Sequence, residues 1–380
     1  MRPRLAYIVT EDWYFLSHRL PMARAARDAG FDVHVLARVK DGREAIEAER
    51  FTLHPLDWSR GSLSPLGNAA AVTDIARRLR SIAPDIVHNI AMKPALLGSL
   101  AAMRVPGAAV VTSITGVGSA FLSPSLAGRI AKGALGHTLA MLLNRRRARA
   151  VVQNPDDRSM LAKLGVRPDH IVLVPGSGVE TEQLLPVAEP PVPPVRVAFV
   201  GRMLEDKGVR ALIEAHRILR RDEVAVELLL AGEPDPENPT SIPRAELEAW
   251  AREPGVTWAG HVANIAELWA RSHIAVLPSR REGLPKSLLE AAACGRPMVA
   301  TDAPGCREVA IPDRTGLLVP VDDARALAAA LSRLAGDADL RARFGAEARR
   351  LAVERFSAAA IGAQTVALYR SLLPAGRDQR

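Results

Sequence analysis

The sequence is poor in cysteine and in aromatic residues. Of its 380 residues only two are cysteine, Cys294 and Cys306, and Phe, Trp and Tyr together make up 4%. Two cysteines without metal-ligand spacing exclude a cysteine-rich zinc site and a disulfide framework, so we expect both to be buried packing residues. So few aromatic residues leave no stacking platform for nucleic acid, and no nucleic-acid motif is present. Nucleic acid is therefore not an expected partner.

Long hydrophobic runs are also missing. No stretch approaches the roughly 18 consecutive apolar residues of a transmembrane helix, and the N-terminal sequence MRPRLAYIVTED turns acidic too soon for a signal peptide. We therefore expect a cytoplasmic protein. No G-x-G-x-x-G follows the first predicted strand, which disfavours a dinucleotide-binding dehydrogenase. Gly116-Val117-Gly118 and Gly176-Ser177-Gly178 predict only tight turns.

Apolar residues and positive charge are what the chain does contain. An apolar content of 48% is enough for two cores of middling size. Residues 1–180 carry 24 Lys and Arg against 15 Asp and Glu, a net charge of +9, which leaves −1 for the remainder of the +8 chain. The basic half is expected to face an anionic partner such as a phosphate or a bilayer surface. An arginine-rich genome could also produce part of this charge without a partner.

Short apolar strands alternate with helical stretches along the whole chain. This alternation predicts parallel, doubly wound sheets, and it restarts after the proline-rich stretch PVAEPPVPPV, which is typical of a stiff linker. The predicted strands are residues 5–10, 31–37, 85–90, 109–114 and 150–154 before the linker, and 195–200, 226–232, 274–278, 298–301 and 316–320 after it.

The segment RREGLPKSLLEAAACGRPMVATDAPGCRE, residues 280–308, is the most informative part of the chain. Apolar IAVLP before it and MVAT within it predict buried parallel strands joined by a loop and a helix. Pro285 is tolerated where a helix begins, and Gly295 and Pro297 are expected to end it. In a parallel sheet such a loop lines the ligand crevice, and the free N–H groups at the helix start favour an anion. The anion suggested is a phosphate.

Two acids, Glu282 and Glu290, stand in this segment with seven residues between them. A carboxylate beside a phosphate site is costly unless it has another task, such as accepting hydrogen bonds from sugar hydroxyls. An amphipathic helix with two surface glutamates is the alternative. With EGLP before the helix, ACGRP at its end and TDAPGCRE after the next strand, the segment resembles the E-x7-E signature of family 4 retaining glycosyltransferases. The resemblance implies that Glu282 meets the donor sugar's hydroxyls and that Glu290 binds the ribose.

The resemblance covers nearly the whole chain. It is strongest with the capsule and surface-polysaccharide branch of the family. The segments that carry this likeness are TEDWYFLSHRLPMARAARDAGFDVHVLA, VHNIAMKP and ITGVG. It implies an α/β protein of the GT-B architecture, in which two doubly wound Rossmann-like domains face a central cleft. We accordingly expect an acceptor-binding domain, a proline-rich linker, a nucleotide-sugar-binding domain and a helix that packs back on the first domain, at residues 1–185, 186–195, 196–356 and 357–373.

The segment FVGRMLEDKG follows the first strand of the second domain. Its Arg202 and Lys207 are two cations that can hold a diphosphate and neutralise the charge growing on it as it leaves. The family carries this GR-x4-KG pattern for that purpose, and a solvated basic loop is the alternative. Further donor contacts are expected at Gly201, Gly283, Leu284, Pro285, Ser287 and Leu288 and, near the nucleobase, at Gly232, Glu233, Gly260 and His261.

The first domain is expected to contribute His88, at a strand's C-terminal end, as a hydrogen-bond partner of the donor sugar or its phosphate. A histidine at a strand end is, however, more often structural. Lys93 follows it in the sequence. Residues 10–12 and 17–19, with His18 and Arg19 as candidates, flank the loop that in the family faces acceptor and diphosphate. The family's double glycine is absent from this loop, so backbone binding of the diphosphate there has no support.

A metal ion is not expected. Asp337-Ala338-Asp339 matches the D-x-D pattern of metal-dependent sugar transferases. It lies between two C-terminal helices, however, where Asp339 is a natural N-cap, and far in sequence from the donor loops. With Arg202 and Lys207 supplying positive charge, we expect no metal and no other cofactor.

Residues 123–150 predict an amphipathic helix with a basic end. Its leucines and isoleucine recur at roughly helical spacing, and it ends in Arg145, Arg146, Arg147 and Arg149. Such a helix can lie on an anionic membrane surface. A core helix with a solvated basic end fits the pattern equally well.

Together these features predict a metal-independent retaining glycosyltransferase, peripheral on the inner face of the cytoplasmic membrane. It would move a sugar from a nucleotide-diphosphate donor, a UDP-sugar such as a UDP-N-acetylhexosamine, to a polyprenyl-diphosphate-linked saccharide or another surface-glycan acceptor. Two alternatives stay open: a nucleotide-sugar 2-epimerase of the same architecture, and a basic membrane or nucleic-acid binding module without activity. An epimerase would consume donor without an acceptor, and in a binding module both Glu282 and Glu290 would be dispensable.

Overall fold

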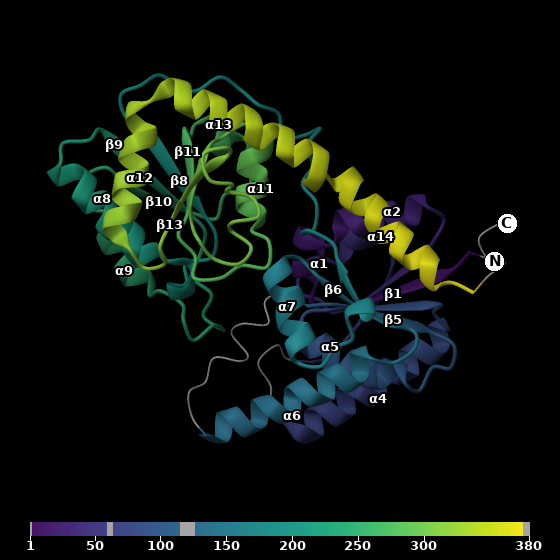
Figure 1. Ribbon diagram of the computed structural model, residues 1–380. Coiled ribbons are helices and arrows are strands. Elements are labelled where there is room, and N and C mark those ends of the chain that lie inside the picture. Colours follow the sequence, from purple (N-terminus) through teal and green to yellow (C-terminus); the bar gives the residue numbers. More distant parts are fainter. Residues whose placement is uncertain (1, 59–63, 115–125, 375–380) are drawn as a thin grey trace. The chain divides into compact units, whose positions relative to one another are not determined.

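The computed structural model describes residues 2–58, 64–114 and 126–374 and divides into two compact α/β units (Figure 1). The first unit comprises Met1–Gly178 and Ala358–Arg380, and the second comprises Val179–Ser357. Gly116-Val117-Gly118 lies outside the described residues, whereas Gly176 and Gly178 have the positive φ angles of 82° and 81° that tight turns require.

The first unit contains a seven-stranded parallel sheet in the order β3-β2-β1-β4-β5-β6-β7. Side chains of β1 alternate between two hydrophobic cores, with Leu5 and Tyr7 in one and Ala6 and Ile8 in the other. A sheet buried on both faces explains why its central strands are almost continuously apolar. The strands are β1 (Arg4–Glu11), β2 (Asp32–Arg38), β3 (Thr52–Pro55), β4 (Ile86–Ile90), β5 (Ala109–Ser113), β6 (Ala148–Val152) and β7 (Ile171–Leu173).

Helices connect these strands, and the C-terminal helix α14 joins the same unit. It packs against α2 (Figure 1), and its Ile361 and Tyr369 lie in the core that also holds Leu5 and Tyr7. The helices are α1 (Asp12–His18), α2 (Leu20–Asp28), α3 (Arg43–Ala48), α4 (Pro65–Ile82), α5 (Met92–Ala102), α6 (Leu126–Leu143), α7 (Pro155–Lys163), the 3-10 turn η2 (Pro168–His170) and α14 (Ala358–Leu372).

The second unit contains a six-stranded parallel sheet in the order β10-β9-β8-β11-β12-β13. Its strands are β8 (Val195–Val200), β9 (Val226–Ala231), β10 (Val256–Gly260), β11 (Ile274–Leu277), β12 (Met298–Thr301) and β13 (Gly316–Val319). Its helical elements are η3 (Glu205–Lys207), α8 (Val209–Arg221), α9 (Arg244–Trp250), α10 (Ile265–Ala270), α11 (Lys286–Ala293), α12 (Ala324–Gly336), α13 (Ala338–Leu351) and the π-helical turn η4 (Ala352–Phe356).

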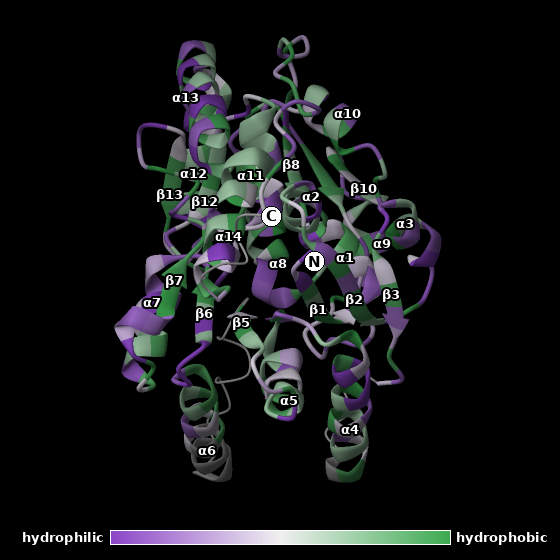
Figure 2. Ribbon diagram, turned by 90° about the vertical axis from the view of Figure 1, so that its right-hand side faces the viewer, coloured by the Kyte–Doolittle hydropathy of each residue, from purple (hydrophilic) through white to green (hydrophobic). Residues whose placement is uncertain are grey.

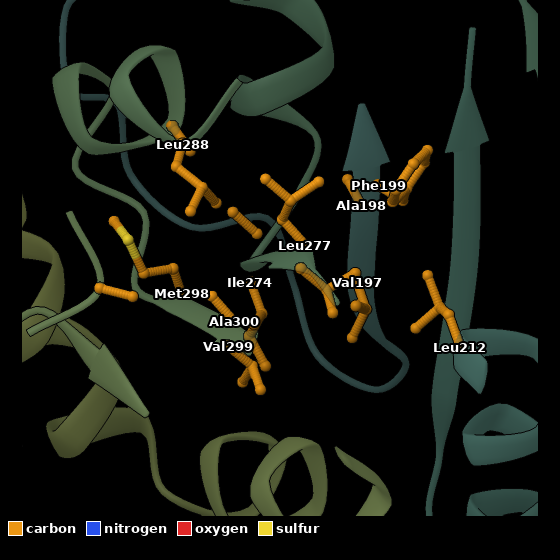
Figure 3. Close-up of a cluster of buried hydrophobic side chains, with 14 of the residues drawn as sticks. Val197, Ala198, Phe199, Leu212, Ile274, Leu277, Leu288, Met298, Val299 and Ala300 are labelled. Atoms are coloured by element: carbon orange, nitrogen blue, oxygen red, sulfur yellow. The ribbon is translucent and has the colours of Figure 1, made fainter. Parts of the chain in front are cut away.

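The core of the second unit is built from its central strands and α11. Ile274 and Leu277 of β11, Val197 of β8 and Met298 of β12 are buried together, and Leu288 of α11 joins them (Figure 3). The core fixes where β11 ends and α11 begins, and therefore where the loop between them lies. Around α13, hydrophilic and hydrophobic residues alternate (Figure 2), as expected for a helix with one buried face.

Every strand predicted from the sequence is present, and β3, β7 and β10 were not predicted. The proline-rich stretch expected to be a linker is bound to the second unit. The buried guanidinium of Arg341 pairs with Glu189 at 2.9 Å, Arg296 donates to the Val187 carbonyl at 3.0 Å, and the His273 ring contacts the Pro190 carbonyl at 3.0 Å. The chain passes from the first unit to the second between residues 178 and 179 and returns between residues 357 and 358.

The expected basic end of the helix at 123–150 is wrong. Helix α6 ends at Leu143, because the chain turns there to enter β6. Arg145, Arg146 and Arg147 lie in that turn, and Arg149 lies within β6. Residues 123–125 lie outside the described part of the chain. No described helix is long and apolar enough to span a bilayer.

Candidate functional site

Each sheet has one topological switch point, where neighbouring strands connect in opposite directions. In the second unit it lies between β8 and β11, and in the first between β1 and β4. Loops at the C-terminal ends of such strands form the ligand crevice of open α/β sheets. The loop after β8 carries Arg202 and Lys207, and the loop after β11 carries Glu282. Arg202, Lys207 and Glu282 therefore lie in the two loops that flank this switch point.

The two cations after β8 are each paired with an acid. Arg202 Nη1 lies 2.6 Å from Asp235 Oδ2, and Lys207 Nζ lies 2.5 Å from Glu282 Oε1. The side chains of Lys207 and Glu282 are 20% and 11% exposed, and that of Arg202 is 42% exposed. The loops after β8 and β11 thus meet through the partly buried ion pair of Lys207 and Glu282, while Arg202 joins the loop after β8 to the loop after β9.

Two glycines let the loops after β8 and β12 approach the end of β11 and the loop that follows it. Gly208 has φ 72°, and a side chain there would clash with the carbonyl of Pro278 at the end of β11. Gly305 has φ 80°, and a side chain there would clash with the carbonyls of Glu282 and Gly283. Main-chain hydrogen bonds from Arg280 N to Asp206 O and from Glu282 N to Pro304 O, both 2.9 Å, complete the assembly. The backbone therefore positions Glu282 rigidly.

Helix α11 begins directly after this loop. Pro285 occupies its N-cap with φ −74°, and Gly295 with φ 70° follows its end, as predicted. Its Glu290 is buried, 3.2 Å from Lys286 Nζ. Burial raises the pKa of the Glu290 carboxyl, and Lys286 partly opposes the rise. Leu284, Pro285 and Leu288 are also buried, and the Leu288 side chain is in the core, while Gly283 and Ser287 are half-buried.

The residues expected near the nucleobase lie together at the ends of β9 and β10. Gly232 N donates to Gly260 O at 2.6 Å, and His261 N donates to Glu233 Oε1 at 3.2 Å. The Gly232 carbonyl accepts from Trp258 Nε1 at 2.9 Å. The His261 side chain is exposed, so a flat ligand here would meet mostly main chain and one imidazole.

His88 has a different environment from the one expected. It lies in the middle of β4 and is 2% exposed. Its Nδ1 is 2.6 Å from the Tyr369 hydroxyl of α14, its Nε2 is 2.8 Å from Ser113 Oγ, and the Tyr369 hydroxyl is 2.8 Å from that of Tyr7. Burial holds the His88 pKa well below its usual range, with a further lowering by Arg19. Both ring nitrogens are therefore occupied inside the first unit.

The two acids where β1 ends and α1 begins, Glu11 and Asp12, also point inward. Asp12 Oδ2 accepts from Lys40 N at 2.7 Å and from Gly42 N at 2.8 Å, which fastens the loop after β2. Glu11 is buried and lies 3.2 Å from the Arg38 guanidinium. Both carboxylates therefore act on this unit's own loops.

Arg19, between α1 and α2, is 1% exposed. Its Nη1 lies 3.5 Å from Met22 Sδ, and its Nε has no hydrogen-bond partner among the described residues. A buried guanidinium without a carboxylate is costly, so this position favours an anionic neighbour. His18 is half-buried, stacked on Tyr14 with ring centroids 4.4 Å apart, and its Nδ1 is 2.6 Å from Ser17 Oγ.

Lys93 belongs to the first turn of α5, directly after β4. It is half-buried with its Nζ 5.8 Å from the centre of the Trp58 ring, and burial lowers its pKa. Ala91, between β4 and α5, has φ 72°, a conformation that costs an alanine about 1 kcal/mol or more. Backbone strain of this kind clusters at active and ligand-binding sites, which makes the start of α5 a candidate ligand-binding segment.

The D-x-D pattern is used for capping. Asp337, not Asp339, is the N-cap of α13, and its Oδ1 accepts from Leu340 N at 2.8 Å. The expected cap was therefore two residues too late. In the described part of the chain, no group of three or more His, Cys, Asp or Glu side chains could hold a metal ion. Cys294 and Cys306 are both buried, as predicted, and burial raises the pKa of Cys294 to about 11.

The sequence did not single out Asp235, the partner of Arg202, or Tyr369, the partner of His88. Asp235 stands in the loop GEPDPENP after β9, so an acid at the C-terminal edge of a predicted strand was the available signal. Tyr369 lies on the last helix, and its partners, Tyr7 of β1 and His88 of β4, are brought to it only by the fold.

Two family models match the chain. "Glycosyl transferase 4-like" matches residues 4–154, and "Glycosyl transferases group 1" matches residues 194–337. The first match covers most of the first unit, and the second covers the sheet that carries Arg202, Lys207, Glu282 and Glu290.

Curated relatives match over long stretches. The chain is 25% identical over 351 residues to the N,N'-diacetylbacillosaminyl-diphospho-undecaprenol alpha-1,3-N-acetylgalactosaminyltransferase of Campylobacter jejuni, covering 86% of this chain and 90% of the relative. It is 28% identical over 177 residues to the capsular polysaccharide biosynthesis glycosyltransferase CapM of Staphylococcus aureus, covering 47% and 46% of the two chains.

Among solved structures, Anabaena HepE in complex with UDP and glucose matches with a TM-score of 0.75 at 18% identity, covering 97% of this chain and 99% of that one. At this identity the likeness shows the fold alone. The fold is GT-B, with two parallel-sheet Rossmann-like units.

Proposed function

The chain belongs to the group 1 and 4-like glycosyl transferases, and we propose that it transfers a sugar from a UDP-sugar to a polyprenyl-diphosphate-linked saccharide with retention and without a metal ion. The observation that carries this proposal is the ion pair of Lys207 and Glu282, which joins the loops after β8 and β11 at the switch point, with Arg202 in the first of these loops. The acceptor class is supported by the C. jejuni relative, whose name specifies a diphospho-undecaprenol-linked sugar. A UDP-N-acetylhexosamine is one donor of this kind.

In the proposed reaction the bond between the sugar's anomeric carbon and the diphosphate oxygen breaks. The acceptor hydroxyl bonds to the same face of that carbon, and its proton passes to the departing diphosphate. Arg202 and Lys207 neutralise the charge that develops on the leaving group, which is the main way a site stabilises such a transition state. Glu282 accepts hydrogen bonds from the sugar hydroxyls as the oxocarbenium-like centre forms.

The remaining candidates of the second unit bind the nucleotide. Glu290 accepts hydrogen bonds from the ribose, and its burial beside Lys286 makes it a fixed acceptor. Main-chain groups of Gly201, Gly283, Leu284, Pro285, Ser287 and Leu288 surround the diphosphate and sugar, and Gly232, Gly260 and His261 receive the base.

In the first unit we assign positioning and acceptor roles. His18, Arg19 and Lys93 would face the acceptor and its diphosphate. Arg19 supports this role because a buried cation without a described carboxylate partner gains most from an anion. His88 would position β4 and α14 from inside the unit, because both of its nitrogens already have partners.

We also propose that the first unit contacts an anionic membrane surface through Arg145 and Arg146. Both are exposed, and no acid pairs with either in the described structure. They border a cavity of about 430 Å³ that is also lined by Val105, Val110, Leu142 and the exposed Met103. Cations around an apolar hollow suit phospholipid headgroups, each cation adding about 1 kcal/mol.

Thermal shifts with a panel of nucleotide sugars test the proposed function. Binding of a UDP-sugar at 100 times its Kd would stabilise the protein by about 2.7 kcal/mol. Transfer to a polyprenyl-diphosphate saccharide should follow and should survive EDTA. Consumption of donor without an acceptor would instead identify an epimerase, and no shift with any nucleotide sugar would contradict the assignment.

A further inference from the structure

Both cations at the donor site are neutralised by acids of the second unit itself. Glu282, the partner of Lys207, has a proposed task with the donor sugar, but Asp235, the partner of Arg202, has none. Its carboxylate occupies one hydrogen-bonding position on a guanidinium that can bind two phosphate oxygens at once. The Arg202 side chain is 42% exposed, whereas that of Asp235 is only 14% exposed.

The position of Asp235 is fixed by its loop. Its N–H donates to Ser241 Oγ at 2.9 Å, and its carbonyl accepts from Asn238 N at 2.8 Å. The loop is joined to the segment around Arg202 by main-chain hydrogen bonds: Met203 N to Glu233 O at 3.0 Å, Glu205 N to Thr240 O at 2.8 Å, and Ile242 N to Met203 O at 2.9 Å. The acid and the cation therefore share one rigid platform.

We propose that Asp235 is a placeholder for the donor's diphosphate, a positioning residue that holds Arg202 in the empty site and is displaced when nucleotide binds. This inference rests on the proposed function of Arg202. A diphosphate carries more charge than a carboxylate and offers oxygens to both nitrogens of the fork, so it replaces Asp235 as the partner.

The placeholder has a cost for affinity and a benefit for turnover. After the exchange, the Asp235 carboxylate is left without its cation and close to the diphosphate, and like charges at short range repel. Asp235 therefore weakens the binding of donor and of nucleoside diphosphate alike. Where product release limits turnover, this weakening speeds the cycle.

Asp235→Asn tests the inference, because the amide keeps the shape and removes the charge. The matched control is Glu253→Gln, since Arg217 and Glu253 form another 2.6 Å pair of the second unit, with side chains 45% and 23% exposed. Calorimetric titrations of the full chain with UDP and with inorganic pyrophosphate give Kd for wild type and for each variant. Pyrophosphate probes the cations without base, ribose or sugar.

We expect Asp235→Asn to bind UDP and pyrophosphate about three- to tenfold more tightly, the scale of removing one partly exposed competing ion pair and its repulsion. KM for the donor should fall, and inhibition by UDP should strengthen, while Glu253→Gln stays at wild-type values. Asp235→Asn should bring no such gain when Arg202→Ala is also present.

Equal or weaker binding by Asp235→Asn, with a wild type that binds UDP and transfers sugar, would overturn the placeholder and leave the proposed function intact. A wild type that binds neither UDP nor pyrophosphate would overturn both.

Discussion

The C-terminal edges of the two sheets hold polar residues in opposite ways. In the second unit Lys207 and Glu282 reach toward each other from separate loops and keep partial exposure. In the first unit the carboxylate of Asp12, directly after β1, is used on internal partners, as are both nitrogens of His88 further back in β4. The comparison teaches that position at a strand end is not enough to define a binding residue. In the second unit the cations Arg202 and Lys207 pair with acids on neighbouring loops and keep partial exposure, so a charged ligand can replace those partners.

The largest expected effect tests whether the paired cations of the second unit act on a ligand. Arg202→Ala and Lys207→Ala should each cost about 2 to 4 kcal/mol of transition-state stabilisation, or about 30- to 1,000-fold in kcat/KM. Steady-state kinetics with saturating acceptor measure the loss. Arg217→Ala, which removes a paired arginine of α8 away from the loops, serves as the control. An unchanged kcat/KM in either variant, or a strict manganese requirement, would contradict the proposal that Arg202 and Lys207 neutralise the leaving diphosphate.

The next effect tests the first unit's side. Tyr369→Phe removes the hydroxyl that joins His88 to Tyr7, and a buried polar group left without a partner costs about 1 to 3 kcal/mol. The urea midpoint should fall accordingly, while Ser371→Ala on the exposed side of α14 should change little. If Tyr369→Phe keeps its stability but loses turnover, then His88 acts on a ligand and the contrast between the two units fails.

A smaller effect concerns the basic surface of the first unit. Replacing both Arg145 and Arg146 by Gln should weaken binding to anionic vesicles about 30-fold at low salt, from about 1 kcal/mol per cation. High salt should weaken wild-type binding in the same way. Arg252→Gln with Arg325→Gln removes two exposed arginines of the second unit and matches the change in charge. If the two double variants float equally well with the vesicles, Arg145 and Arg146 belong to a solvated turn that does not contact the membrane.

The smallest effect sharpens the role of Glu290 through pH. Burial raises its folded pKa above the usual 4.5, so the carboxyl becomes neutral as pH falls through that raised value. A neutral carboxyl is the weaker ribose acceptor, which predicts that UDP affinity falls by about fivefold below this pKa. The pH dependence of Kd for wild type relative to Glu290→Gln isolates the residue, since phosphate ionisation affects both alike. Parallel curves would exclude Glu290 from the ribose.

The burial of Glu290 makes the stability of the protein depend on pH in the opposite direction to its UDP affinity. A carboxyl with a raised folded pKa is favoured in its neutral form, so its contribution to stability is present at low pH and is lost as pH rises through the folded pKa. The urea midpoint of Glu290→Gln relative to wild type should therefore rise with pH across this window.

The sequence predicted the central strands and the loops after β8 and β11 because both depend on local patterns. The apolar runs of β8, β11 and β12 need burial on both faces, and Pro285 and Gly295 mark the two ends of α11. The unpredicted strands β3, β7 and β10 are edge strands with three to five residues. An edge strand needs no buried run, so its pattern is weak.

Partners brought together by the fold were beyond local patterns. His88 and Tyr369 are 281 positions apart in the sequence, and Arg202 and Asp235 are 33 apart. The D-x-D pattern caps α13, but which of its aspartates does so depended on where α12 ended. The sequence indicates which segments carry polar and charged residues. Only the packing decides whether such a side chain faces a ligand or a neighbouring residue.

The most direct test of the account is the turnover of Glu282→Gln set against its affinity for UDP. An orienting contact made mainly in the transition state lowers kcat and leaves nucleotide binding in place. We predict a loss of at least about 100-fold in kcat with a Kd for UDP within about threefold of wild type. Wild-type turnover in this variant would contradict the central claim that Glu282 acts on the donor sugar.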